Sequence, residues 1–133
     1  MILTLNLTQH AATPEQLAAG VVDLPDDRRE WLSGALTFDS LPTSADLRAR
    51  AEAVAAFAVR EGLISGVFDA EEGFGRVMIG GAPFFMVHLE LELEACGLQP
   101  LYAFSKRVSV EEVLPDGSVG KTTKFRHEGF VGT

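Results

Sequence analysis

Apolar residues along this chain gather in short runs separated by polar stretches that contain glycine and proline. Four of these runs have the length and composition of β-strands, and they cover residues 2–7, 21–24, 76–79 and 101–104. Two further runs, residues 108–114 and 119–125, flank the turn sequence Pro115-Asp116-Gly117-Ser118. Proline presets φ and glycine supplies a positive φ in such turns, so this C-terminal part is predicted to be a β-hairpin.

The chain is organised around the stretch from residue 75 to residue 107. Its first apolar run ends at Gly80-Gly81, and Pro83 then opens a segment that stops at Gly97. Proline is favoured just inside a helix start and glycine just past its end, which predicts a helix between two strands. We expect the two strands to be parallel and their crossover to be right-handed.

One pattern inside this helix also fits another structure. Residues 89–94 alternate leucine and glutamate, which is typical of a half-exposed strand. At helical spacing, however, four apolar side chains share one face: Phe85, Leu89, Leu93 and Cys96. Because this face lies between clear start and stop signals, we expect a helix that buries all four side chains.

Two shorter helices are predicted before the central unit. The sequence Thr13-Pro14-Glu15-Gln16 is a capping box with proline at the first helical position, so a short helix begins there and ends near Gly20. Residues 26–36 form the second helix, with Trp31 and Leu32 expected to turn inward.

The longest helix follows Leu41-Pro42. Thr43 caps it, with Asp46 three residues on, and Gly62 ends it. Its buried stripe is expected to comprise Leu47, Ala51, Val54, Ala55, Ala58 and Val59. Residues 65–74 contain acidic residues and glycines and are expected to form a surface excursion.

This order of elements predicts one α/β domain spanning residues 1–133. The sheet is expected to be Rossmann-like, open and mostly parallel, with helices on its faces and an antiparallel hairpin at the C-terminus. A chain of 133 residues is long enough for a substantial core, and neither an internal repeat nor a low-complexity segment is apparent in its sequence.

Composition narrows the functional classes. The net charge of −8 disfavours a nonspecific grip on nucleic acid, so DNA is not an expected partner. The longest apolar runs are far shorter than the roughly 20 residues of a membrane span. The N-terminal residues lack the basic flank of a signal peptide. A single cysteine, Cys96, leaves no internal disulfide, and the cytoplasm is the expected compartment.

The charge is unevenly distributed. Residues 1–105 hold 6 Lys and Arg against 15 Asp and Glu, whereas residues 106–133 hold 5 against 4. The five C-terminal cations are Lys106, Arg107, Lys121, Lys124 and Arg126. They form either a solvated hairpin or a small anion site on an otherwise acidic protein.

In open α/β sheets, ligands bind beyond the carboxyl ends of the strands, where connections diverge to opposite faces. Three loops are predicted to meet there: residues 7–12, 80–82 and 105–107. Gly80-Gly81 lets the backbone approach a ligand, and the following helix N-terminus suits a phosphate. The same glycines also fit a plain tight turn.

Polar side chains cluster at the end of the first strand: Asn6, Thr8, Gln9 and His10. They serve either local turn chemistry or recognition of a base or ribose. His10 is able to carry a proton near neutral pH. Of the other histidines, His88 is expected to be structural, and His127 is either a surface residue or a site residue.

The third loop carries Ser105, Lys106 and Arg107, and Arg126 lies on the opposing strand of the hairpin. Charge-assisted contacts from lysine and arginine suit a phosphodiester, although an exposed basic loop is an equal alternative. The sequence shows neither His, Cys or Asp residues at metal-ligand spacing nor a nucleophile elbow. Metal and cofactors are therefore not expected.

Several of these segments, in order, resemble a known family. They are a Thr-Gln-His turn, Thr-Pro-Glu-Gln, Val-Asp-Leu-Pro before a Trp-bearing segment, Pro-Leu-Tyr-Ala-Phe-Ser-Lys-Arg, and a Pro-Asp-Gly-Ser-Val hairpin closing on Lys-Phe-Arg-His. The chain resembles the small stand-alone CARF-like (CRISPR-associated Rossmann fold) ring nucleases of type III CRISPR systems. Its turn Ile79-Gly80-Gly81-Ala82-Pro83 departs from the Gly-Asp-Phe-Gly-like turn associated with that group.

The resemblance implies a metal-independent nuclease that cleaves cyclic oligoadenylate, in particular cyclic tetra-adenylate, and so switches off type III CRISPR signalling. The products would be linear with a 2′,3′-cyclic phosphate. A two-fold homodimer would hold the two-fold ring.

The resemblance also implies roles for the candidate residues. Lys106 and Arg107 would stabilise phosphate charge, and His10 would act as general base or acid. The remaining ligand-binding candidates are Asn6, Thr8, Gln9, Gly80, Gly81, Ser105 and Arg126. Two alternatives stay open: a module that binds the nucleotide without cleaving it, and an interaction protein whose hairpin pairs with a partner.

Overall fold

The computed structural model describes residues 1–71 and 75–132 and contains every helix and strand that the pattern predicts. The strands are β1 (Thr4–Leu7), β2 (Val21–Val22), β3 (Gly75–Ile79), β4 (Leu98–Val113) and β5 (Val119–Gly132). The helices are α1 (Pro14–Ala18), α2 (Asp26–Ala35), α3 (Ser44–Ile64) and α4 (Pro83–Ala95). In the predicted excursion at 65–74, residues 72–74 lie outside the described part, and Phe68 is buried rather than exposed.

The five strands form one sheet in the order β2-β1-β3-β4-β5. The first four strands are parallel, and β5 is antiparallel to β4. This arrangement confirms the predicted α/β class with a mostly parallel sheet and a C-terminal antiparallel hairpin. The strand order reverses direction between β1 and β3, because β2 lies on one side of β1 and β3 on the other.

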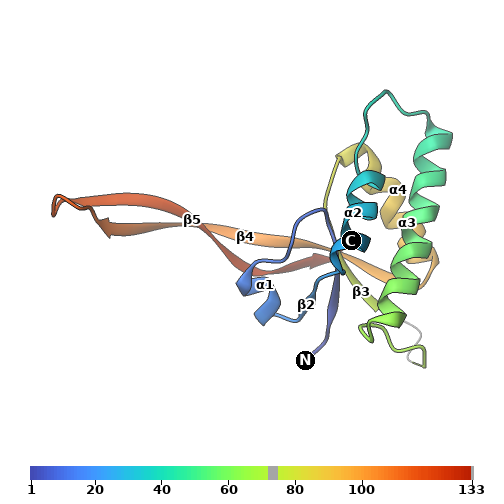
Figure 1. Ribbon diagram of the computed structural model, residues 1–133, viewed down its shortest axis with the longest axis horizontal. Helices are drawn as coiled ribbons and strands as arrows, with labels where there is room; N and C mark the ends of the chain where they lie inside the picture. Colours follow the sequence, from blue (N-terminus) through green and yellow to red (C-terminus); the bar gives the residue numbers. More distant parts are fainter. Residues whose placement is uncertain (72–74, 133) are drawn as a thin grey trace.

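The two faces of the sheet are covered unequally. Figure 1 shows α3 and α4 packed together on one side, while the short α1 lies on the other. This division follows from right-handed crossovers, since the connection from β1 to β2 runs opposite to the connection from β3 to β4. The core on the α3–α4 side includes Leu5, Leu7, Val77, Ile79, Val54, Phe57, Phe85, Leu89 and Leu93.

The capping predictions are confirmed. The hydroxyls of Thr13 and Thr43 each accept a hydrogen bond from the backbone N–H three residues on, and the side-chain oxygens of Gln16 and Asp46 accept from the backbone N–H groups of Thr13 and Thr43. The segment from Pro83 is a helix despite its alternating leucines and glutamates. In the helix, Leu89 and Leu93 lie on one face that packs against the core, and both side chains are fully buried.

Three predictions of burial are wrong. Cys96 is exposed because α4 ends at Ala95, so the thiol belongs to the C-cap and not to the helical face. Trp31 remains 46% exposed and covers the edge of the core by stacking on Phe57 at a ring-centroid distance of 4.5 Å. Val59 lies at the rim of the α3 stripe and is half-buried.

The predicted break at residues 105–107 is also wrong. Beyond Leu101, β4 leaves β3 and continues to Val113 while paired with β5. A β-bulge adjusts the register where Phe104 pairs with Gly129 and Ser105 pairs with His127. We call residues 104–129 the arm, and Figure 1 shows it projecting away from the helices.

The tip of the arm has the predicted turn. Leu114 N–H donates to the Ser118 carbonyl at 2.7 Å, and Gly117 N–H donates to the Leu114 carbonyl at 2.9 Å. Gly117 has a φ of +84°, which glycine adopts without the strain of a side chain. The Asp116 carboxylate accepts hydrogen bonds from the backbone N–H and hydroxyl of Ser118. These bonds hold the pKa of Asp116 below its usual value.

Candidate functional site

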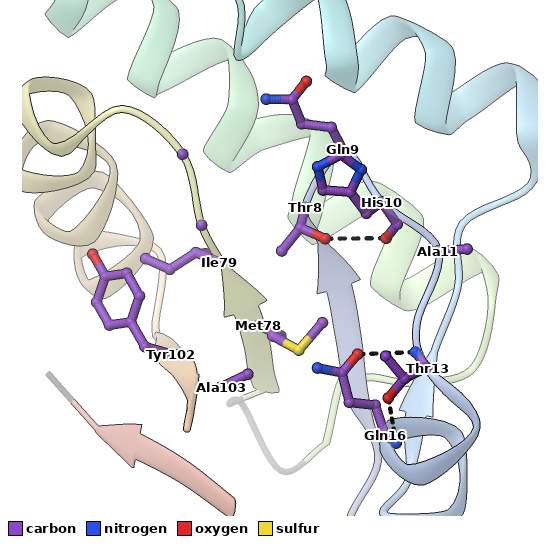
Figure 2. Close-up of a pocket in the computed structure, with 12 residues that line it drawn as sticks. Thr8, Gln9, His10, Ala11, Thr13, Gln16, Met78, Ile79, Tyr102 and Ala103 are labelled. Carbon is purple, nitrogen blue, oxygen red and sulfur yellow. Dashed lines mark hydrogen bonds between the residues drawn. The ribbon is translucent and has the colours of Figure 1, made fainter. Parts of the chain in front are cut away.

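A cavity of about 470 Å³ opens at the carboxyl ends of β1 and β3 and beside Tyr102 and Ala103 of β4. It is lined by Thr8, Gln9, His10, Ala11, Thr13, Gln16, Met78, Ile79, Gly80, Gly81, Tyr102 and Ala103. Figure 2 shows these side chains around the ends of the parallel strands. Because β1 and β3 are the strands between which the sheet order reverses, the cavity lies at the topological switch point, where open α/β sheets bind ligands.

Asn6 shapes the loop that forms one wall of this cavity. The side chain is only 2% exposed, and its Nδ2 donates to the His10 carbonyl and to Asp23 Oδ1, both at 2.8 Å. Its Oδ1 accepts from the backbone N–H and the hydroxyl of Thr8, at 3.0 and 2.7 Å. Asn6 was predicted to contact a ligand. It does not line the cavity, and its amide is fully used in holding the loop.

Asp23, the residue that follows β2, supports the same loop. Its Oδ1 also accepts from the Ala12 N–H at 2.9 Å, so one carboxylate oxygen ties the end of the loop to the Asn6 amide. Thr8 contributes a second bond to the His10 carbonyl at 3.1 Å. The backbone between Thr8 and Ala12 is therefore fixed by side chains of β1 and of the residue that follows β2.

The fixed loop leaves three side chains available at the cavity. His10 is exposed, and within the described residues no hydrogen bond involves its imidazole, so both ring nitrogens can reach a ligand. Gln9 is half-buried, and its Oε1 accepts a long hydrogen bond of 3.3 Å from the Ser33 hydroxyl. The methyl group of Thr8 faces Gly80.

Gly80 and Gly81, which were predicted to bring the backbone close to a ligand, line the opposite wall of the cavity. Gly81 has a φ of +155°, which favours glycine, and a Cβ there would lie 3.2 Å from Met86 Cε. A Cβ at Gly80 would meet only Thr8 Cγ2, at 3.7 Å. Helix α4 begins two residues later at Pro83, so its positive N-terminal end faces this region.

The sequence interpretation missed the cavity residues of α1 and β4. Thr13 and Gln16 are the two members of the α1 capping box, and Tyr102 and Ala103 are the last β4 residues before the arm. A usable signal was present, because the loop from Thr8 to Thr13 is too short to carry α1 away from the end of β1.

Tyr102 has the strongest electrostatic perturbation at the site. Burial, and then the charge and hydrogen bond of Glu90 on α4, raise the pKa of Tyr102 from 10.0 to about 12. Each effect disfavours the phenolate. The side chain thus remains a neutral hydrogen-bonding group, with an aromatic face at the cavity, throughout the physiological range.

This shift predicts a stability change at alkaline pH. The raised pKa favours the neutral phenol in the folded state, so the stabilising contribution is complete below pH 10.0 and is lost as the pH rises to about 12. Ultraviolet titration of tyrosinate tests this directly, because Tyr102 is the only tyrosine in the chain. Tyr102→Phe should lack that part of the alkaline stability loss. A titration midpoint at the ordinary value would contradict the burial of the phenol.

The predicted cations are not part of the cavity wall. Lys106, Arg107 and Arg126 lie on the arm with Ser105, and none of these four residues lines the cavity. Ser105 lies on the same side of β4 as the lining residue Ala103, and the cations follow farther along the arm. The described lining contains neither lysine nor arginine, so the small anion site predicted from these cations does not coincide with the cavity.

Within residues 1–71 and 75–132, the structure has no group of three or more His, Cys, Asp or Glu side chains arranged to hold a metal ion. In the same residues, every helix is too short or too polar to cross a membrane. The groups of the lining that can contact a ligand are its hydrogen-bonding side chains, the Gly80-Gly81 turn and the phenol of Tyr102.

Comparison with known proteins gives a family. Comparisons with curated proteins and with solved structures gave no match. Residues 3–131 match a family model, and the matched range contains the whole cavity lining and the whole arm. Since this match extends over nearly the full length of the chain, the protein belongs to the Uncharacterized protein MJ1673 family.

Proposed function

We propose that the protein binds a cyclic oligoadenylate with one nucleotide unit in the cavity at the β1–β3 switch point. The observation that carries this proposal is the meeting of the Thr8–His10 loop with the Gly80-Gly81 turn around one cavity. Its volume of about 470 Å³ is in the lower part of the roughly 300–1,000 Å³ range of small-ligand sites. Such a space suits part of a nucleotide ring, with the remainder held outside it or by a second copy.

The lining supplies the contacts that a nucleotide needs. Gln9, Gln16 and Thr13 carry both donors and acceptors, as recognition of a base edge or a ribose requires. The phenol ring of Tyr102 offers an aromatic face on which a base stacks, a contact worth about 1–3 kcal/mol. The Gly80-Gly81 backbone and the start of α4 favour a phosphate at the other end of the cavity.

The strand order supports the Rossmann-like part of the proposal. The sequence β2-β1-β3-β4 corresponds to the first four positions of the doubly wound order 2-1-3-4-5. The antiparallel β5 and the small α1 distinguish this chain from a fully doubly wound sheet.

We propose cleavage of the ring by internal transesterification. The ribose 2′-oxygen attacks the adjacent phosphorus in line while the bond from phosphorus to the 5′-oxygen breaks, leaving a 2′,3′-cyclic phosphate. The 2′-hydroxyl gives up its proton, and the departing 5′-oxygen gains one. His10 is the candidate general base and acid, since its imidazole is at the cavity and both ring nitrogens are without a hydrogen-bond partner within the described residues.

A specific observation favours a second function, binding without cleavage. The cations Lys106 and Arg107 would have to neutralise the transition state, yet they lie on the arm beyond the cavity. A protein that holds the ring through neutral hydrogen bonds and stacking would sequester it. Binding and cleavage are therefore to be measured separately.

The test is incubation of the purified protein with cyclic oligoadenylates of different sizes in a chelator, followed by separation of products. Wild-type protein is expected to yield linear products ending in a 2′,3′-cyclic phosphate. His10→Gln should cleave about 100-fold or more slowly while binding changes little. His88→Gln, on α4 outside the cavity lining, is the matched control and should behave as wild type.

Each other outcome is informative. Tight binding with intact ring recovered would establish the sequestering function and reject the nuclease. Equal cleavage by wild type and His10→Gln would remove His10 from the mechanism. Absence of both binding and cleavage across the panel would reject the ligand class.

A further inference from the structure

The arm has two unlike faces. Along β4, residues 106, 108 and 110 point to one side, and their cross-strand partners on β5 are residues 126, 124 and 122. This side, which we call the basic face, contains Lys106, Val108, Val110, Thr122, Lys124 and Arg126, and at its outer end Glu112, whose Oε1 accepts from the Thr122 hydroxyl at 3.4 Å. It continues the face of β4 on which Tyr102 packs against the α3–α4 core, so it begins on the side of the sheet that α4 covers.

The three cations of the basic face have no acidic residue directly opposite them on the strand pair. Lys106 lies directly opposite Arg126, and Lys124 lies opposite the next residue of that face, Val108. Like charges directly opposite one another on a strand pair are destabilising. In the described part of the chain, none of these three cations takes part in a salt bridge. The face thus presents three unpaired positive charges around two half-buried valines.

The opposite face of the arm is balanced by comparison. Arg107 lies over the ring of its cross-strand partner Phe125, with 5.6 Å between the guanidinium carbon and the ring centroid. Farther out, Glu111 is opposite Lys121. Charges on this face therefore meet opposite charges or an aromatic ring directly across the arm, whereas Lys106, Lys124 and Arg126 of the basic face do not.

Helix α4 presents a complementary surface. Phe84, Val87 and Leu91 are 51%, 58% and 61% exposed and lie at positions i, i+3 and i+7, so they form one apolar stripe. Glu90 and Glu94 flank this stripe one turn apart, and the helix contains three glutamates and no lysine or arginine. We call this surface the outer face of α4.

We propose that the basic face of the arm docks on the outer face of α4 of a second copy of this chain. The two surfaces pair cations with carboxylates around apolar centres: the three cations, Glu94 and the apolar stripe of α4 are exposed within their own chain, while the valines and Glu90 are half-buried. The acidic character of residues 1–105, with 15 Asp and Glu against 6 Lys and Arg, makes the body of another copy an attractive target for the arm.

Symmetry explains why the partner is a second copy. Every copy of the chain has both the basic face and the outer face of α4, so a two-fold axis would create two identical contacts at once. The arm of each chain would lie across the helix of the other. The docking would also support the arm itself, because a two-stranded ribbon standing alone in water is only marginally stable.

The test is the molecular mass of the full chain, measured by light scattering and sedimentation over a range of concentrations. Wild type is expected to be a dimer in about 0.05 M salt and to dissociate more readily in about 0.5 M salt, where screening is stronger. The variant Lys106→Glu/Lys124→Glu/Arg126→Glu should raise the dissociation constant by roughly 100-fold or more. Leu91→Lys, which places a cation on the outer face of α4, should have a similar effect.

Two controls separate this contact from general charge effects. Lys121→Glu changes the balanced face of the arm and should leave the dimer intact. Leu41→Lys alters a fully exposed leucine outside α4, and it should likewise have little effect. Circular dichroism of every variant should match that of the wild type.

Carbodiimide cross-linking identifies the contact directly, because it joins a lysine to a carboxylate without a spacer. In mixtures of isotopically labelled and unlabelled chains, we expect mixed-label peptides linking Lys106 or Lys124 to the glutamates of α4. A chain that is monomeric at all concentrations and salts would overturn the proposal. So would a dimer that survives both the triple substitution and Leu91→Lys.

Discussion

Replacing Gly62 by alanine is expected to destabilise the protein by about 2–4 kcal/mol. Gly62 lies near the end of α3, and a Cβ at this position would overlap the ring of Phe68. A Cβ at Gly75, the first residue of β3, would overlap the same ring from the other side. Phe68 is only 8% exposed, so an added methyl group must expel a large apolar side chain from the core or displace α3.

Helix propensity alone would make a glycine-to-alanine change in a helix stabilising, whereas Gly62→Ala is expected to be destabilising. A helical glycine with open space around it therefore provides the control. Gly34 in α2 has no atom within 4 Å of the position a Cβ would take, so Gly34→Ala should stabilise by about 0.5–1 kcal/mol. Denaturant unfolding of both variants measures the difference. In a Phe68→Ala background the collision is absent, and Gly62→Ala should then cost nothing. A Gly62→Ala protein as stable as Gly34→Ala would contradict the packing described here.

Replacing Asn6 by aspartate is expected to destabilise the protein by about 2–4 kcal/mol at neutral pH and to abolish ligand binding. The change keeps the shape of the side chain but removes the two N–H donors that serve the His10 carbonyl and Asp23. It also places a buried carboxylate against the Asp23 carboxylate. Burial and like charge both raise the pKa of the new group, so the loss should diminish as the pH falls and the carboxyl is protonated.

The compensating change is Asp23→Asn. In the double variant, the neutral amide at position 23 removes the negative charge beside the carboxylate at position 6 and its Oδ1 can still accept from the Ala12 N–H, which restores part of the lost stability. Unfolding measurements at neutral and acidic pH, together with binding of cyclic oligoadenylate, report both effects. Equal losses for the single and double variants would show that Asn6 and Asp23 are not coupled.

Much of the fold was predictable because local signals agreed with the tertiary structure. The capping boxes at Thr13 and Thr43 and the signals around Pro83 and Gly97 located three of the four helices. The alternating leucines and glutamates of α4 gave a competing strand pattern. The segment forms a helix because α3 packs against the face that contains Leu89 and Leu93.

The length of β4 was not predictable from composition. Polar residues at 105–107 suggested a loop, yet the strand continues because β5 returns along it and supplies backbone partners. Pairing between strands is a long-range property that polarity at three positions does not reveal. This error placed the cations at the cavity, whereas they lie on the arm.

Of the three loops predicted to form the site, two lie together in the structure. Thr8, Gln9, His10 and the Gly80-Gly81 turn do meet at the sheet end, as parallel topology requires. The role of Asn6 was different from that predicted, because alternation along β1 turns its side chain beneath the loop rather than into the cavity. Tyr102 was missed because a tyrosine within an apolar strand does not differ in pattern from a core residue.

The β-bulge in the ribbon has a consequence for the distribution of charge. Glu128 is the extra residue between Gly129, opposite Phe104, and His127, opposite Ser105. This single residue offsets β5 by one position relative to β4. As a result, Lys124 and Arg126 lie on the same face of the arm as Lys106, and not on the face of the residues that adjoin Lys106 in β4. The length of β5, as much as its composition, therefore determines which surface of the molecule is positive.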